Sequence, residues 1–166
     1  MSVIKKIAEN LKILKEAAFK IEVEVLDGGG LPVKAHASDA GFDLFATEDI
    51  TVDPGQVIKH PLNIKFNLPI GSWARVETKS GLGAKGMLVY AGVIDRGYRG
   101  VVHVICTNLN QDRTARYSDR VIVIKKGEKI AQLTLNPHAE QFYMVQVDKV
   151  DAETDRGEGG FGSSGL

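Results

Sequence analysis

The feature that most constrains the fold is a change to two-residue hydrophobic periodicity near residue 20. Residues 20–26 (KIEVEVL) alternate apolar and charged side chains, as expected of a strand with one buried face. Short β-rich runs follow, separated by turn residues such as Pro54-Gly55 and Lys126-Gly127. These runs are residues 56–61, 63–68, 73–78, 88–93, 101–107, 121–124, 130–135 and 141–147. Many short strands at this spacing predict an all-β fold, a barrel or sandwich of the jelly-roll kind.

The two ends of the chain depart from this pattern. Apolar residues recur at three- and four-residue spacing before residue 20, which predicts one amphipathic helix. The tail reads DRGEGGFGSSGL from Asp155, and we expect this glycine-rich segment to be mobile and able to close over a ligand. The predicted organisation is an N-terminal helical extension at 1–19, a β domain at 20–150 and a flexible C-terminal lid at 151–166.

Composition excludes several classes of function. The chain has 166 residues, enough for one domain, and a formal net charge of zero, which gives no support to a nucleic-acid surface. The single cysteine, Cys106, excludes an internal disulfide framework, and its apolar neighbours predict a buried structural thiol. No apolar run is long enough for a signal peptide or a membrane span. We therefore expect a cytoplasmic protein that binds neither nucleic acid nor membrane.

Glycine-rich and histidine patterns add no further function. Three stretches match G-x-G-x-x-G, at residues 81–86, 157–162 and 160–165, but none has the strand before it and the helix after it that a dinucleotide site needs. The four histidines lack the spacing of metal ligands. We expect them on the surface or in strands, with His103 a candidate for the core.

Three short stretches are candidates for chemistry, although each also fits an ordinary turn. Asp43 and Asp95 both lie among glycines, where an aspartate commonly caps the backbone. The sequence Lys79-Ser80-Gly81 offers a charge, a hydroxyl and free N–H groups, a combination that could hold an anion. None of these features identifies a function on its own.

Taken together and in order, five stretches resemble the five motifs of the trimeric dUTPase family. They are SDAGFDLFA (38–46), ARVETKSGLG (74–83), AGVIDRGYRG (91–100), GEKIAQL (127–133) and RGEGGFGSSG (156–165). The resemblance covers roughly residues 20–166 and implies a jelly-roll fold. It also implies hydrolysis of dUTP to dUMP and pyrophosphate by a Mg²⁺-dependent homotrimer, with active sites at subunit interfaces. That reaction keeps uracil out of DNA and supplies dUMP for thymidylate synthesis.

The resemblance assigns the reacting end of the substrate to charged and polar residues. Asp95 corresponds to the base that activates water for attack on the α-phosphorus, and a carboxylate suits that task. Asp43 corresponds to the residue that holds Mg²⁺ through water, in keeping with the hydration that this ion retains. The phosphate contacts would be Lys79, Ser80, Gly81 and Gln132.

The same resemblance assigns the nucleoside end. Tyr98 would pack against the deoxyribose and exclude a 2′-hydroxyl by clash. Uracil would be read by the main chain of a hairpin around Gly92, Val93 and Ile94. In the tail, Phe161 would stack on uracil and Arg156 would reach the phosphates. Gly162 and Ser163 would add contacts as the lid closes.

Some positions depart from the family pattern. Lys79 stands where many members have arginine, and Glu128-Lys129 replaces the usual Asp-Arg. Residues 108–125 are about eight longer than usual by this comparison, and we predict an extended hairpin there. We also expect the helix of 1–19 to dock on a neighbouring subunit.

Two other functions stay open. A dCTP deaminase would need a glutamate in the strand after the third motif, and the sequence there, VVHVICTN, has no acid. The other alternative is a nucleotide-binding regulatory protein encoded by a phage or virus, which would act in the host cytosol.

Overall fold

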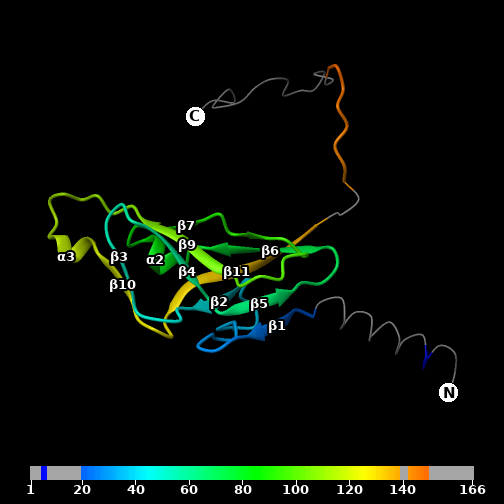
Figure 1. The fold of residues 1–166 in the computed structure, drawn as a ribbon, viewed down its shortest axis with the longest axis horizontal. Helices are drawn as coiled ribbons and strands as arrows, with labels where there is room; N and C mark the ends of the chain where they lie inside the picture. The colour runs from blue at the N-terminus through cyan, green and yellow to red at the C-terminus, as the bar shows by residue number, and fades with distance from the viewer. Residues whose placement is uncertain (1–4, 7–19, 139–141, 150–166) are drawn as a thin grey trace.

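The structure, a computed structural model, describes residues 5–6, 20–138 and 142–149. Short strands predominate in this part of the chain, with two one-turn helices between them (Figure 1). The strands are β1 (Glu22–Val25), β2 (Gly41–Phe45), β3 (Ile50–Val52), β4 (Val57–Pro61), β5 (Ile64–Asn67), β6 (Ser72–Glu77), β7 (Met87–Tyr90), β8 (Val93–Ile94), β9 (His103–Asn108), β10 (Ile122–Ile124) and β11 (Lys129–Pro137). The helices are α2 (Ser80–Gly83) and α3 (Tyr117–Arg120).

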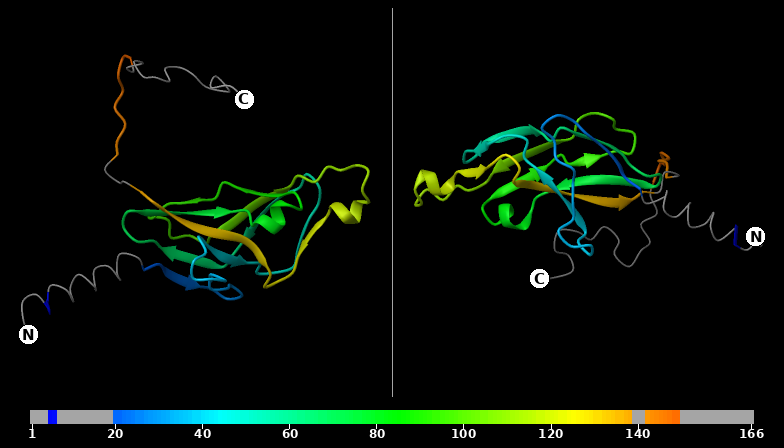
Figure 2. Two further views of the ribbon diagram at one scale, coloured as in Figure 1. Left: turned by 180° about the vertical axis from the view of Figure 1, so that it is seen from behind. Right: turned by 90° about the horizontal axis from the view of Figure 1, so that it is seen from below.

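All paired strands are antiparallel and enclose one core. The two larger sheets have the orders β2–β11–β6–β8 and β4–β9–β7, while β1 pairs with β5 and β3 with β10. Figure 2 shows the strands gathered in one body, with residues 142–149 running away from it. Buried apolar side chains from every sheet form a single cluster, which includes Leu44, Ile64, Val104, Ile124 and Leu133. This arrangement agrees with the all-β class predicted from two-residue periodicity.

Strand β9 shows how the periodicity specifies the packing. Val104, Cys106 and Asn108 are buried, while the alternate residues face outward and are half-buried. Cys106 is fully buried, and burial raises the pKa of its thiol to about 11. The thiol is therefore protonated at neutral pH, which confirms the prediction of a structural cysteine. The buried histidine is His60 rather than His103, which is half-buried.

Several predicted elements differ in the structure. The run at 88–93 is two strands, β7 and β8, because the chain turns at Ala91, where φ is +52°. Strands β2 and β3 were not expected, since their sequences are short and the first is flanked by turn residues. The predicted strand at 141–147 is wrong for the residues described there, because 142–147 form no strand.

The segment between β9 and β10 is not the extended hairpin that we predicted. It contains α3, and β10 pairs with β3 instead of with β9. Asn108 anchors the segment: its buried amide donates to the carbonyls of Val52 (2.9 Å) and Arg120 (2.6 Å) and accepts from Asn110 N–H (2.9 Å). A long-range polar contact therefore overrides the local tendency of the segment to fold back on itself.

The terminal predictions fall largely outside the described residues. Lys5 and Lys6 are helical. The rest of the predicted 1–19 helix and the whole of the predicted 151–166 lid lie outside the described residues. Among the residues that the structure describes, no helix is long and apolar enough to cross a membrane.

Candidate active site

A tight turn after β8 carries Asp95. Ile94 is buried in the core and fixes the start of the turn, so Asp95 follows it as an exposed residue. Tyr98 N–H donates to the Asp95 carbonyl (3.0 Å), which closes the turn. The Tyr98 ring lies over Gly100, where an added Cβ would come within 2.5 Å of the Tyr98 hydroxyl oxygen. The turn therefore requires glycine at 100 to keep the tyrosine in place.

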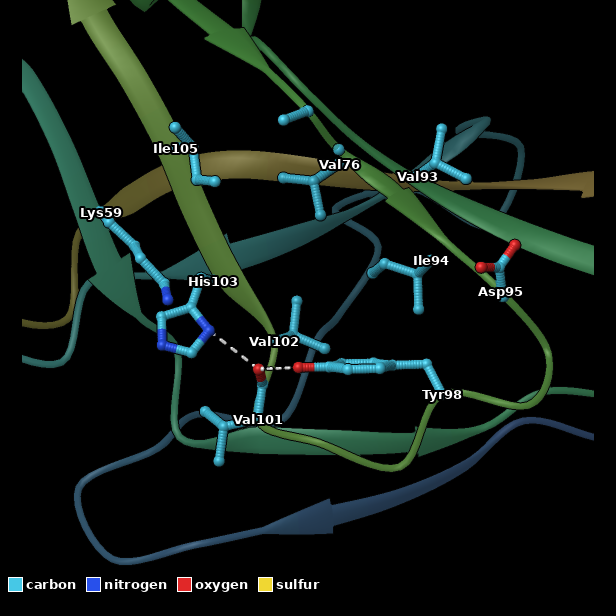
Figure 3. Close-up of a pocket in the computed structure, with 12 residues that line it drawn as sticks. Lys59, Val76, Val93, Ile94, Asp95, Tyr98, Val101, Val102, His103 and Ile105 are labelled. Atoms are coloured by element: carbon cyan, nitrogen blue, oxygen red, sulfur yellow. Dashed lines mark hydrogen bonds between the residues drawn. The ribbon is translucent and has the colours of Figure 1, made fainter.

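One carbonyl holds two side chains beside this turn. The Val101 oxygen accepts a hydrogen bond from the Tyr98 hydroxyl (2.9 Å) and lies 2.8 Å from His103 Nδ1. Because a carbonyl can only accept, His103 presents a protonated Nδ1 to it. Figure 3 shows both side chains directed at this oxygen from opposite sides. The position of the tyrosine ring is thus set by its own loop.

A cavity of about 240 Å³ lies against the turn. It brings together five residues that the sequence analysis named separately, Gly92, Val93, Ile94, Asp95 and Tyr98. Figure 3 shows Asp95 and Tyr98 toward one end and Lys59 and His103 toward the other. The remaining lining is Val76, Ala91, Val101, Val102 and Ile105. Apolar side chains along the wall, with a few polar groups at the ends, are typical of a small-molecule site.

The cavity lies between β8 and β9, which would pair with each other in a simple hairpin. In the described part of the chain, β8 pairs with β6 and β9 pairs with β4 and β7, but β8 and β9 do not pair with each other. The hairpin expected around Gly92–Ile94 is paired through β7 and β9 and opens at β8, which pairs with β6 instead. Gly92 packs tightly on β6, where its carbonyl accepts from Val76 N–H (2.8 Å). This separation places residues 92–94 along the wall of the cavity.

A second cluster forms where β2, β11 and β6 meet. Gln132 lies between Asp43 on β2 and Glu77 on β6 in the strand register, and its amide donates to the Thr78 carbonyl (3.1 Å). Lys79 follows β6 and pairs with Asp43 Oδ1. The sheet therefore assembles Asp43, Lys79 and Gln132 from three separate motifs.

The carboxylate of Asp43 is buried between two lysines. Lys129 Nζ lies 2.7 Å from Oδ2, and Lys79 contacts Oδ1, while the Asp43 side chain is only 8% exposed. Burial acts to raise the pKa of Asp43, but hydrogen bonds and charges from Lys129 and Lys79 outweigh it and lower the pKa. The carboxylate stays ionised, and the cluster has one surplus positive charge close to Ser80 and Gly81, which are exposed at the start of α2.

The two parts of the predicted site do not share one cavity. Neither of the two cavities lined by Asp95 includes Asp43, Lys79, Ser80, Gly81 or Gln132. The structure brings the nucleoside-side residues together around the first cavity, and Asp43, Lys79 and Gln132 together where β2, β11 and β6 meet. Arg156, Phe161, Gly162 and Ser163 lie outside the described residues.

Sequence reasoning missed three residues of these clusters. Lys129 was noted only as a conservative change, yet it contacts Asp43 directly. Lys59 and His103 gave no signal, because only the pairing of β4 with β9 places them at one end of the cavity. For Lys129, the one hint in the sequence was its place just before Ile130 in the fourth motif. Among the described residues, no group of three or more His, Cys, Asp or Glu could hold a metal ion.

Comparison with known sequences points to one family. The dUTPase family model matches residues 29–165. The chain is 37% identical over 139 residues to the Pol polyprotein of Ovine maedi visna related virus, covering 84% of this chain but only 12% of the polyprotein. It is 38% identical over 136 residues to the deoxyuridine 5′-triphosphate nucleotidohydrolase of Saccharomyces cerevisiae, covering 81% of this chain and 86% of that protein.

Comparison with solved structures agrees. The dUTPase of Staphylococcus bacteriophage 80alpha, solved with dUPNHPP, matches with a TM-score of 0.79 and 27% identity. The match covers 89% of this chain and 99% of the phage chain. It confirms the mostly β fold class that the sequence predicts.

Proposed function

The chain belongs to the dUTPase family, and from that premise we propose that it hydrolyses dUTP to dUMP and pyrophosphate. The reaction keeps uracil out of DNA and supplies dUMP for thymidylate synthesis. The observation that carries the proposal is the cavity in which Asp95, Tyr98 and the main chain of residues 92–94 meet. That cavity offers a carboxylate, a flat aromatic ring and the main chain of a strand in one place.

Asp95 is the general base. It takes a proton from a water molecule, whose oxygen attacks the α-phosphorus, and the bond from that phosphorus to the bridging oxygen breaks to release pyrophosphate. Neutral water attacks a polyanion slowly, and a positioned base contributes on the order of 10²–10⁴ in rate. The exposed position of Asp95 at the edge of the cavity leaves room for both the water and the phosphate.

Tyr98 and the open β8 segment select deoxyuridine. The Tyr98 ring is held by the Val101 carbonyl and by its packing on Gly100, so it cannot swing aside for a 2′-hydroxyl, and UTP is rejected by clash. Uracil pairs with main-chain groups around Gly92, Val93 and Ile94. Cytosine would bury a mismatched donor or acceptor there, which is unfavourable.

Lys79, Ser80, Gly81 and Gln132 bind the phosphates. Asp43 holds the ammonium groups of Lys79 and Lys129 by its two oxygens, which keeps two positive charges close together. Only one is neutralised by the carboxylate, so the cluster attracts an incoming polyanion. Lysines act as point charges, without the two-pronged geometry of arginine. They tolerate several phosphate orientations.

Mg²⁺ fits this chain as an ion that arrives with the nucleotide. Mg²⁺ binds through one or two carboxylates, substrate phosphates and retained waters, and the described residues offer no denser cluster of acids. Asp43 has lone pairs to spare beside its two lysine contacts, since a carboxylate provides about four acceptor positions. It can therefore hold a water of the hydrated ion. When bound, Mg²⁺ would screen the triphosphate and stabilise the charge on the departing pyrophosphate.

The enzyme is a homotrimer with its active sites at subunit interfaces. Two observations support this assembly. Asp43, Lys79 and Gln132 do not line the cavity that contains Asp95 and Tyr98 of the same chain, which fits a substrate that takes its phosphate contacts from a neighbouring copy. In addition, Phe142, Tyr143 and Met144 run away from the body of the protein with at least 83% of each exposed, an apolar segment of the kind that docks on a partner. A three-fold ring is an ordinary closed assembly.

The C-terminal tail closes over the bound nucleotide. Phe161 stacks on uracil, Arg156 reaches the phosphates, and Gly162 and Ser163 add contacts. The family resemblance of the tail supports these roles, since the residues lie outside the described part of the chain. Closure would exclude water other than the attacking molecule.

Pyrophosphate release tests the proposal directly. Wild type, Asp95→Asn and the control Asp119→Asn are assayed with Mg²⁺ and each of dUTP, dCTP, UTP and dTTP. We expect turnover of dUTP alone, a loss of about 10²–10⁴ in kcat for Asp95→Asn and wild-type rates for the control. Asp119 is suitable because it lies exposed on α3, away from both clusters.

Other outcomes identify the alternatives. Ammonia release from dCTP would support a deaminase, although Asp95 is the only acid that lines the cavity among the residues described. Absence of turnover with every nucleotide would favour the nucleotide-binding regulatory protein. Full dUTP turnover by Asp95→Asn would refute the assignment of the base.

A further inference from the structure

Arg99 holds the turn that carries Asp95. One guanidinium nitrogen, Nη1, donates to two carbonyls of the turn, those of Arg96 (2.6 Å) and Tyr98 (3.0 Å). The other, Nη2, donates to Asn67 Oδ1 (2.7 Å) on β5. A single side chain thus joins both halves of the turn to a strand of the β domain.

The turn lies on the surface of the β domain. Within it, one backbone hydrogen bond joins Tyr98 N–H to the Asp95 carbonyl, and both of these residues are exposed. Exposed turns with few buried contacts fluctuate more readily than the strands beside them. The planar guanidinium offers donors in a fixed geometry, so three acceptors become fixed relative to one another.

The strand at the other end of these bonds is well anchored. Ile64 and Phe66 of β5 are buried in the core on either side of Lys65, so the backbone leading to Asn67 is held by packing. Asn67 in turn donates to Glu22 Oε2 (2.8 Å) on β1. Its amide is therefore oriented from one side by Glu22 and presents its oxygen to Arg99 on the other.

We infer that Arg99 is a positioning residue for hydrolysis, which fixes Asp95 relative to the cavity by tying the turn to Asn67. The inference rests on the proposed function, because it takes Asp95 as the base. Arg99 touches no reacting atom in this scheme. It acts through the geometry of the turn, and an error of about 1 Å in the placement of a catalytic group can cost on the order of 10²-fold in rate.

A role in positioning differs measurably from a role in folding. Arg99 is exposed and contacts no core residue in these bonds, so Arg99→Gln should leave the unfolding temperature and the oligomeric mass unchanged. We expect kcat for dUTP to fall about 10- to 100-fold. KM should change much less, because Tyr98 keeps its own hydrogen bond to the Val101 carbonyl and the phosphate cluster at Asp43 is untouched. Arg99→Lys keeps a donor but loses the fork, and should recover part of the lost kcat.

A double-mutant cycle tests the connection to β5. Asn67→Ala should lower kcat by a smaller factor than Arg99→Gln, and the double variant should be no slower than Arg99→Gln alone, since both changes break one connection. Arg113→Gln is the matched control, because Arg113 is an exposed arginine on the loop between β9 and α3. It should retain wild-type kcat and KM.

The pH–rate profile separates placement from electrostatic tuning. If Arg99 places the base, the plateau of kcat/KM drops in Arg99→Gln while its acidic inflection stays at the wild-type pH. Wild-type kcat in Arg99→Gln, together with an inactive Asp95→Asn, would overturn this inference and leave the proposed function intact. Wild-type activity in Asp95→Asn would instead remove the premise. A lowered unfolding temperature in Arg99→Gln that accounts for the lost activity would also contradict positioning.

Discussion

Lys129 places its ammonium nitrogen 2.7 Å from Oδ2 of Asp43, across the pairing of β11 with β2. Lys79 holds the other carboxylate oxygen from the end of β6. The two lysines come from different motifs and share one buried anion. Asp43 therefore has a structural role of its own, because its carboxylate lets two lysine ammonium groups lie close together beside Ser80.

Replacing Asp43 should change how stability depends on acid. The lysines lower the pKa of Asp43 below its ordinary value of 3.8, so the ion cluster stabilises the fold fully above pH 3.8 and ceases to do so as pH falls through the lowered pKa. Asp43→Asn should cost about 1–3 kcal/mol at pH 7. It should also flatten the loss of stability below about pH 4, as measured by urea unfolding.

Asp49→Asn serves as the comparison for Asp43→Asn. Asp49 also pairs with a lysine, Lys125 (2.8 Å), but both side chains are largely exposed, and exposed pairs contribute little. Equal losses of unfolding free energy at pH 7 in Asp43→Asn and Asp49→Asn would show that burial does not strengthen the Asp43 ion pairs.

His60 should make the fold sensitive to mild acid. Its Nε2 accepts a hydrogen bond from Thr47 N–H (3.1 Å), so the neutral ring fits this buried position. Burial lowers the pKa of His60, with Glu48 opposing and His103 adding to the shift. Its stabilising effect is therefore complete above its ordinary pKa of 6.5 and lost as pH falls through the lowered value.

The measurement for His60 is urea unfolding at several pH values between 5 and 8. His60→Gln should be less stable than wild type by about 1–3 kcal/mol at pH 7.5, with a smaller dependence on pH. The control His138→Gln removes an exposed histidine and should keep the wild-type slope. Parallel curves for wild type and His60→Gln would rule out this source of acid sensitivity.

Local sequence patterns predicted several of the strands. Strand β4 lies within the expected run 56–61, and β9 overlaps the run 101–107 and ends one residue beyond it. Branched and apolar residues favour strands in both runs. Strand β2 was missed because its glycine suggested a turn. In the structure Gly41 packs closely against β11, where an added Cβ would lie 3.0 Å from the Gln132 side-chain oxygen. This contact joins two strands that are distant in the sequence, so no local pattern could predict the role of that glycine.

The site was predictable in parts for the same reason. The five motifs named Asp95, Tyr98 and Lys79, since each stands in its own characteristic stretch of sequence. Their spatial grouping depends on strand register, which no short motif specifies. Lys129 reaches Asp43 only through the pairing of β11 with β2, and that pairing contains a register shift between Lys129 and Ala131.

Gly92 should tolerate no side chain. A Cβ at this position would lie 2.2 Å from the Val76 carbonyl oxygen, a backbone atom that cannot move aside without breaking the pairing of β6 with β8. Gly92→Ala should therefore lower the free energy of unfolding by about 1–3 kcal/mol. Because Gly92 also lines the cavity, KM for dUTP should rise. Gly97→Ala, where a Cβ meets open space, should keep wild-type stability; a Gly92→Ala protein as stable as that control would contradict the packing argument.

The exposed apolar segment at 142–147 should be needed for assembly. Phe142, Tyr143 and Met144 are each at least 83% exposed within one chain, and burying them on a second copy would remove a large apolar area from water. Phe142→Ser combined with Met144→Ser should shift the trimer toward smaller species in light scattering across a range of concentrations. Turnover should fall in parallel, because the proposed active sites lie at subunit interfaces. Gln146→Ser, a polar change in the same segment, should remain trimeric, and a fully active wild-type monomer would exclude both the assembly and the shared site.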